Sequence, residues 1–186
     1  MRFTPTPLAD ACVLELEKIE DERGYFARTW CVREFREHGL EERLVQCSTS
    51  FNAVRGTLRG LHYQIASHAE SKLVRCTRGA IFDVIADLRP SSPTFLLWHG
   101  VELSAESGRM LYIPKGFAHG FQTLEPGSEV FYQMSEYYEP AAGRGVRWND
   151  PLLSVRWPLP VTVISEKDRL YPDADAERFL RESAGK

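Results

Sequence analysis

A succession of short apolar runs, separated by turn-forming residues, constrains the fold of this sequence more than any other feature. Apolar and polar residues alternate through residues 80–87, and this period of two is typical of a β-strand. Turn signals separate the runs, as in Arg-Pro-Ser-Ser-Pro at 89–93 and Glu-Pro-Gly at 125–127. Many short strands with such punctuation predict an all-β sandwich or barrel, whose mouth or cavity is a common place for a ligand.

The length of the sequence predicts one domain that covers residues 1–186. The apolar runs and turn signals also predict the positions of its strands and helices. The predicted strands span residues 11–16, 44–50, 57–64, 71–78, 80–88, 94–103, 110–113, 117–123, 128–137 and 161–164. Only two short helices are predicted, at residues 31–38, where Gly39 provides a stop signal, and at residues 175–183.

Composition excludes several classes of protein. A formal net charge of -3 and an isoelectric point near 6.0 argue against nucleic-acid and membrane-surface partners. No apolar run is long enough to span a bilayer, and we expect no signal peptide at the N-terminus. The four cysteines form no metal-binding or redox motif, so we expect reduced thiols in a cytoplasmic protein.

The segment Leu-Arg-Gly-Leu-His-Tyr-Gln at 58–64 carries unusual side chains for a plain core strand. Arg59 and His62 are three residues apart, so a regular strand would send them to opposite faces. A β-bulge at Gly60 would turn both side chains inward. A buried histidine that is merely satisfied by hydrogen bonds is the alternative interpretation of this segment.

Four further segments combine polar chemistry with an ordinary structural alternative. Lys72 precedes an apolar run and could be a strand-edge lysine. His119 lies among aromatic residues and glycines, which suit either close ligand approach or a tight turn. Tyr132 lies in an alternating strand, where a packing tyrosine is common. The charged cluster Ser-Glu-Lys-Asp-Arg at 165–169 follows a strand, and its ordinary alternative is a solvated loop.

In their order along the chain, these segments resemble the dTDP-4-dehydrorhamnose 3,5-epimerase family. The resemblance runs from about residue 17 to residue 168. It rests on Asp-Glu-Arg-Gly-Tyr-Phe (21–26), Leu-Arg-Gly-Leu-His-Tyr-Gln (58–64), Lys-Leu-Val-Arg (72–75), Phe-Asp-Val (82–84), Asp-Leu-Arg (87–89), 113–121, Trp-Asn-Asp-Pro (148–151) and Ser-Glu-Lys-Asp (165–168).

The resemblance implies a cupin-type jelly roll, usually a homodimer, that needs no metal and no organic cofactor. The substrate would be a nucleotide-linked 4-keto-6-deoxy sugar, whose ketone acidifies the C–H bonds at C3 and C5. The most direct expectation is conversion of dTDP-4-dehydro-6-deoxy-D-glucose to dTDP-4-dehydro-L-rhamnose. The enzyme would remove a proton from one face of the sugar and return a proton to the other face.

The resemblance also assigns roles to residues. His62 matches the catalytic base, Asp168 the carboxylate that pairs with it, Lys72 the cation beside the enolate oxygen, and Tyr132 the acid. The expected substrate-binding residues are Arg23, Phe26, Gln46, Arg59, His119, Tyr137 and Lys167. Arg28 and Ser48 depart from the family pattern near the expected nucleotide site, which leaves the nucleobase open, with thymidine as the default and cytidine and guanosine as the alternatives.

Other functions stay open at this point. A relative of this type could epimerise C3 alone or C5 alone, or could move the ketone from C4 to C3. The pattern Pro114-x-Gly116-x-x-His119 is similar to the second metal motif of metal-dependent cupins, but the His-x-His of the first motif is missing after His62. A non-catalytic sugar-binding jelly roll is the remaining alternative.

Overall fold

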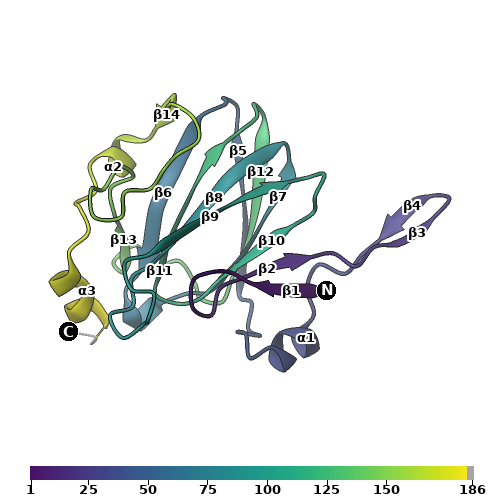
Figure 1. Ribbon diagram of the computed structural model, residues 1–186, viewed down its shortest axis with the longest axis horizontal. Coiled ribbons are helices and arrows are strands. Elements are labelled where there is room, and N and C mark those ends of the chain that lie inside the picture. The colour runs from purple at the N-terminus through teal and green to yellow at the C-terminus, as the bar shows by residue number, and fades with distance from the viewer. Residues whose placement is uncertain (184–186) are drawn as a thin grey trace.

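Two facing β-sheets form the body of the protein, which the computed structural model describes over residues 1–183 (Figure 1). The first sheet has the strand order β1-β2-β10-β7-β12-β5, and the second has the order β13-β6-β11-β8-β9 with β14 added beside β6. Their bounds are β1 Arg2–Pro5, β2 Cys12–Glu15, β5 Gln46–Asn52, β6 Thr57–Gln64, β7 Lys72–Arg78, β8 Ala80–Asp87, β9 Trp98–Ser104, β10 Met110–Ile113, β11 Phe117–Thr123, β12 Ser128–Met134, β13 Gly143–Gly145 and β14 Val163–Ile164. The expected all-β jelly roll with few helices is confirmed.

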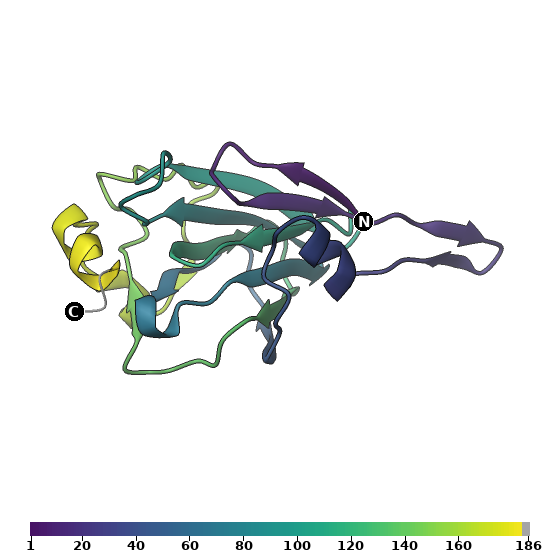
Figure 2. The same cartoon turned by 90° about the horizontal axis from the view of Figure 1, so that it is seen from below.

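The remaining elements lie around these sheets. The helices are α1 Val32–Glu37, the 3₁₀ turn η1 Ala66–His68, α2 Glu166–Arg169 and α3 Ala176–Ser183. Strands β3 Ile19–Asp21 and β4 Gly24–Phe26 pair with each other in a separate two-stranded sheet, and their hairpin projects from the end of the molecule opposite to α3 (Figures 1 and 2). Within residues 1–183, no helix is both long enough and apolar enough to cross a membrane.

Three predicted strands have their predicted bounds, and the others differ mainly at their ends. Strand β9 begins at Trp98 rather than at residue 94 because Leu97 donates to the carbonyl of Thr94 in a turn, and Leu96 has a φ of 63°. Strands β1, β3, β4 and β13 were not predicted. The solvated loop that was the ordinary alternative at 165–169 is not observed, since Ser165 caps the short helix α2 there.

The second sheet is covered on both of its faces. Ile81 and Ile85 of β8 point into the core between the two sheets. Val84 and Ala86 point to the other face, where the C-terminal segment, including Phe179 of α3, covers them. Successive side chains of β8 therefore point alternately into two apolar layers, one on each face of the second sheet. The polar pocket described below lies between the sheets, beside the first layer.

A β-bulge in β6 sets the direction of two polar side chains. His62 pairs with His119 of β11, whereas Arg59 pairs with Phe121, so β6 advances three residues while β11 advances two. Gly60 lies at this point with a φ of 124°. The bulge restores Arg59 to the face that carries His62, as the sequence analysis anticipated.

Replacing Gly60 should show how strongly the bulge depends on glycine. A Cβ at position 60 would lie 2.5 Å from the Cα of Gly120, so Gly60→Ala would create a clash with the backbone of β11. The substitution would also strain the backbone, because alanine rarely adopts the positive φ of Gly60. We expect Gly60→Ala to lower the free energy of unfolding by roughly 2–5 kcal/mol, measured by chemical denaturation. Gly24→Ala is the matched control, because Gly24 has a φ of 122° and nothing within 4 Å of its added Cβ. Equal losses in both variants would contradict a role for the close approach to Gly120.

Candidate active site

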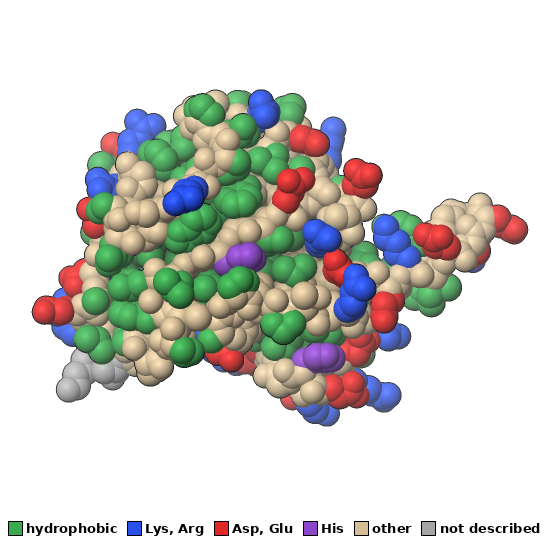
Figure 3. Space-filling model, viewed as in Figure 1, with side chains coloured by type: hydrophobic (Ala, Val, Ile, Leu, Met, Phe, Trp, Pro, Cys, Tyr) green, Lys and Arg blue, Asp and Glu red, His purple; other side chains and the backbone are tan. Residues whose placement is uncertain are grey.

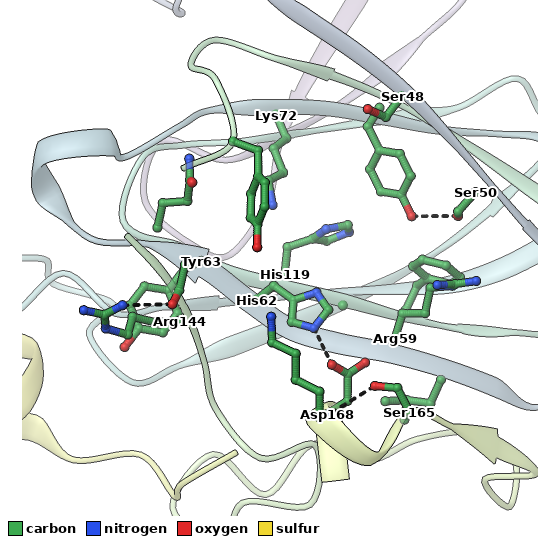
Figure 4. A pocket seen from close by; sticks show the side chains of 18 of the residues that line it. Ser48, Ser50, Arg59, His62, Tyr63, Lys72, His119, Arg144, Ser165 and Asp168 are labelled. Carbon is green, nitrogen blue, oxygen red and sulfur yellow. Dashed lines mark hydrogen bonds and ion pairs between the residues drawn. The ribbon is translucent and has the colours of Figure 1, made fainter. Parts of the chain in front are cut away.

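A pocket of about 750 Å³ opens between the two sheets and under the segment that carries β14 and α2. One wall comes from β5, β7 and β12 of the first sheet, and the opposite wall from β6 and β11 of the second (Figure 4). The lining combines aromatic rings with groups able to carry charge, as in a site for a polar ligand.

His62 and Asp168 form a hydrogen-bonded pair in this pocket. The Nε2 atom of His62 lies 2.6 Å from Oδ1 of Asp168 (Figure 4). An ionised carboxylate only accepts hydrogen bonds, so Nε2 is the donor and Nδ1 is the nitrogen left able to accept a proton. The side chain of His62 is 42% exposed, whereas that of Asp168 is 6% exposed. The carboxylate of Asp168 therefore fixes the tautomer of His62, whose ring faces the pocket.

Asp168 is held in place by hydrogen bonds with β6 and with the capping residue of its own helix α2. Its Oδ2 accepts a hydrogen bond of 3.1 Å from the backbone N–H of Gly60, and its own N–H donates to the capping Ser165. Burial raises the pKa of Asp168, but the hydrogen bond with His62 and the N–H of Gly60 outweigh burial and leave this pKa below its ordinary value. Asp168 is thus a carboxylate at neutral pH.

His119 has a carboxylate partner of its own. Its Nε2 lies 2.7 Å from Oδ1 of Asp83, and both side chains are almost completely buried. The other oxygen of Asp83 has no hydrogen-bond partner within residues 1–183. His119 lines the pocket directly beside His62, since the two residues are opposite each other in the β6–β11 ladder.

Tyr132 reaches the pocket from β12, on the wall opposite to His62. Its hydroxyl lies 3.0 Å from Oγ of Ser50. Burial raises the pKa of Tyr132 well above its ordinary value, against smaller effects of the Ser50 hydrogen bond and nearby charges. The phenol therefore carries its proton at neutral pH and can act as an acid.

Four cationic side chains line the same pocket: Arg59, Lys72, Arg144 and Lys167. The ammonium of Lys72 lies 3.1 Å from a carboxylate oxygen of Glu70. The Nε of Arg59 donates a 2.7 Å hydrogen bond to the buried Asn52. Such a concentration of positive charge suits a phosphate-bearing ligand.

The structure brings together eight of the residues singled out from the sequence. They are Gln46, Arg59, His62, Lys72, His119, Tyr132, Lys167 and Asp168. Tyr137 does not line the pocket: it is exposed, and the neighbouring Tyr138 lines the pocket instead. Arg23 and Phe26 do not line it either, because the β3–β4 hairpin that carries them projects away from the body (Figure 1).

Several residues of the site were not singled out from the sequence. Asp83 could have been found, because it is a charge in the middle of a mostly apolar strand, on the face that carries Ile81 and Ile85. Ser50 shares the period-two spacing of Gln46 and Ser48, which also line the pocket. Glu70 and Arg144 had no signal: Glu70 lies outside a strand, where a charged residue is normally solvated, and Arg144 lies in β13, which was not predicted.

Metal ligation was one alternative for the two histidines. Among residues 1–183, no group of three or more His, Cys, Asp or Glu side chains is arranged to hold a metal ion. His62 and His119 each use Nε2 for a separate aspartate. The chemistry that this arrangement offers directly is proton transfer, with a fixed base, a half-buried phenol and a nearby ammonium.

Comparisons with known proteins agree on one family. The family model of dTDP-4-dehydrorhamnose 3,5-epimerase matches residues 5–175. A curated dTDP-4-dehydrorhamnose 3,5-epimerase of Methanothermobacter thermautotrophicus is 47% identical over 171 residues, which cover 90% of this chain and 91% of that protein. The crystal structure of the Bacillus anthracis enzyme with TDP and pyrophosphate bound has a TM-score of 0.90, 42% identity and coverage of 93% of this chain and 99% of that one. The Legionella pneumophila enzyme in complex with dTDP-4-keto-L-rhamnose has a TM-score of 0.87, 38% identity and coverage of 95% of both chains.

The buried carboxylate of Asp168 should make stability depend on acid. Because its pKa is lowered on folding, its contribution is complete above the ordinary value of 3.8 and is lost as pH falls through the lower folded-state pKa. Urea denaturation at pH 7 and pH 3 should therefore show that the wild type loses more stability on acidification than Asp168→Asn does. Glu166→Gln, which alters an exposed carboxylate on the same helix, should lose as much as the wild type. An identical acid response in wild type and Asp168→Asn would contradict this linkage.

Proposed function

Because the chain belongs to the dTDP-4-dehydrorhamnose 3,5-epimerase family, we propose that its pocket epimerises a dTDP-linked 4-keto-6-deoxy sugar at C3 and C5. The chain is accordingly an isomerase. The observation that carries the proposal is the His62–Asp168 pair on one wall of the pocket, with the phenol of Tyr132 on the other wall. An acid and a base on opposite sides are what inversion of a carbon centre requires.

The reaction begins with removal of a proton next to the ketone. Nδ1 of His62 takes the proton from C3 or C5, and Asp168 stabilises the imidazolium that results. The electron pair of the broken C–H bond moves into the ring and places negative charge on O4. The ammonium of Lys72 supplies the positive charge that this enolate oxygen needs.

The reaction ends with a proton delivered to the opposite face. Tyr132 gives its hydroxyl proton to the carbon, the new C–H bond forms, and the carbonyl at C4 is restored. The phenol suits this step, since its raised pKa keeps the proton on the oxygen until carbon becomes basic. Arg59, His119 and Lys167 hold the sugar and the diphosphate in this proposal, and Gln46 contacts the nucleoside.

The wild-type protein can be tested with dTDP-4-keto-6-deoxyglucose in heavy water, with the C3–H and C5–H signals followed by NMR. Loss of both signals, with L-rhamnose obtained after a 4-reductase traps the product, is the expected result. Loss of one signal would instead identify a monoepimerase. A new ketone position would identify a ketoisomerase, and no exchange at all would contradict the proposed function.

His62→Ala tests the base directly. Removal of the imidazole should slow exchange at both carbons by roughly 10²–10⁴-fold, because general base catalysis is lost. His38→Ala, which removes an exposed histidine of the N-terminal region, should exchange like the wild type. Circular dichroism should confirm that both variants are folded. Undiminished exchange in folded His62→Ala would require another base.

We further propose that the protein works as a homodimer in which each β3–β4 hairpin reaches the pocket of the partner. The hairpin exposes large apolar side chains, including Ile19, Tyr25 and Phe26, which are 68%, 53% and 71% exposed. In Figure 3 the hairpin forms an extension of the molecule that carries hydrophobic and charged side chains. Arg23 and Phe26 could then serve the substrate-binding role expected of them only in a second copy.

Mixing two defective variants tests this sharing of residues. One variant carries Arg23→Ala with Phe26→Ala, and the other carries His62→Ala. If hairpins act in the partner's pocket, a random mixture after refolding should regain about one quarter of wild-type activity, because half of the dimers have one complete site. A mixture no more active than the average of its two components would contradict the shared site. Size-exclusion chromatography with light scattering checks the dimer itself.

The thiols fit the proposed cytoplasmic location. All four cysteines are unpaired, and Cys12 and Cys76 are buried. Burial raises the pKa of Cys12 to about 12 and that of Cys76 to about 11, so both are unreactive thiols at neutral pH. Unpaired cysteines suit a reducing compartment.

A further inference from the structure

The hydroxyl of Tyr132 has a single hydrogen-bond partner within residues 1–183. That partner is the hydroxyl of Ser50, at 3.0 Å, and the bond is the dashed line from Ser50 in Figure 4. The family resemblance gave Ser50 no role. Its contact with the acid nevertheless places it next to the oxygen that loses a proton in the proposed reaction.

Strand pairing fixes this contact. In the antiparallel pair of β5 and β12, Tyr132 is directly opposite Ser48, and Ser50 is opposite Val130. Ser50 is therefore the diagonal neighbour of Tyr132 on the same face, at a distance that a long aromatic side chain can span. The backbone positions of both residues are set by the sheet, so the serine hydroxyl can hold the phenol in one orientation.

The surroundings of Tyr132 offer little other support for a negative charge. Arg59 on β6 favours the phenolate, whereas Asp83 on β8 disfavours it, and both act at longer range than Ser50. The ring of His119 on β11 meets the tyrosine ring edge to face, with centroids 6.2 Å apart. Burial is the largest effect and opposes ionisation. A direct hydrogen bond to the oxygen is thus the main local compensation for the charge that forms on it.

We propose that Ser50 is the positioning residue of Tyr132: it orients the phenol toward the substrate carbon and donates a hydrogen bond to the phenolate left after proton transfer. This inference rests on the proposed function. In the step concerned, the O–H bond of Tyr132 breaks and a C–H bond forms. The electron pair of the O–H bond stays on the phenolate oxygen. Ser50 keeps its own proton throughout and shares it only as a hydrogen bond.

The proposal separates two rates that a general structural defect would lower together. In heavy water, His62 can remove a proton and return a deuteron to the same face, so exchange needs no acid on the opposite wall. Inversion needs Tyr132. Loss of the Ser50 hydroxyl should therefore slow inversion and leave exchange intact.

The experiment compares Ser50→Ala, Ser50→Thr, Tyr132→Phe and the wild type by NMR in heavy water, with inversion and exchange measured separately. We expect Ser50→Ala to lower kcat for inversion about 10- to 100-fold, since it removes a hydrogen bond to a charged group. KM and the exchange rate should stay within about twofold of the wild-type values. Ser50→Thr, which keeps a hydroxyl, should recover most of the inversion rate. Thr49→Ala changes the adjacent, exposed residue of β5 and should match the wild type.

The outcomes distinguish this inference from the proposed function. Wild-type inversion in Ser50→Ala, while Tyr132→Phe is inactive in inversion, would overturn the role of Ser50 and leave the acid in place. A parallel fall of exchange and inversion in Ser50→Ala would also overturn it, because that result signals general damage to the pocket. Wild-type inversion in Tyr132→Phe would overturn both the acid and its positioning residue.

Discussion

The close approach of Gly60 to Gly120 is the constraint on which the pocket depends. The bulge at Gly60 brings Arg59 back to the face of His62, and its N–H holds one oxygen of Asp168 while His62 holds the other. Backbone geometry and side-chain chemistry are therefore joined at one point of β6. A regular strand would supply the same residues without gathering them, because alternate side chains would face opposite layers.

The strands were predictable because their signals are local. Short apolar runs and Gly/Pro turns are enough to place β6, β10 and β11 with their observed ends. The elements that were not found lack such signals: β3 and β4 are exposed along their whole length, and β13 is three residues long. Helix α2 was taken for a loop because a helix of four residues is defined by its serine cap rather than by periodicity.

The residues of the site that match family motifs could be predicted from the sequence. The residues whose place in the site depends on how the strands pair were harder to predict. His62, Lys72, Tyr132 and Asp168 meet in one pocket, as expected from the resemblance. The partners that tune them depend on register between distant segments, which single-strand patterns do not encode. Arg23 and Phe26 show a second limit of prediction from motifs, since a residue that matches a motif need not reach the pocket of its own chain.

The pairing of His62 with Asp168 spans 106 residues and has a consequence for biosynthesis. During translation, both sheets can assemble while the segment after β14 is still inside the ribosome, because their long strands precede residue 135. The carboxylate arrives only when α2 emerges and docks on β6. A nascent chain can therefore have the core between its sheets formed and His62 in place, yet lack the carboxylate that makes His62 a base until α2 docks.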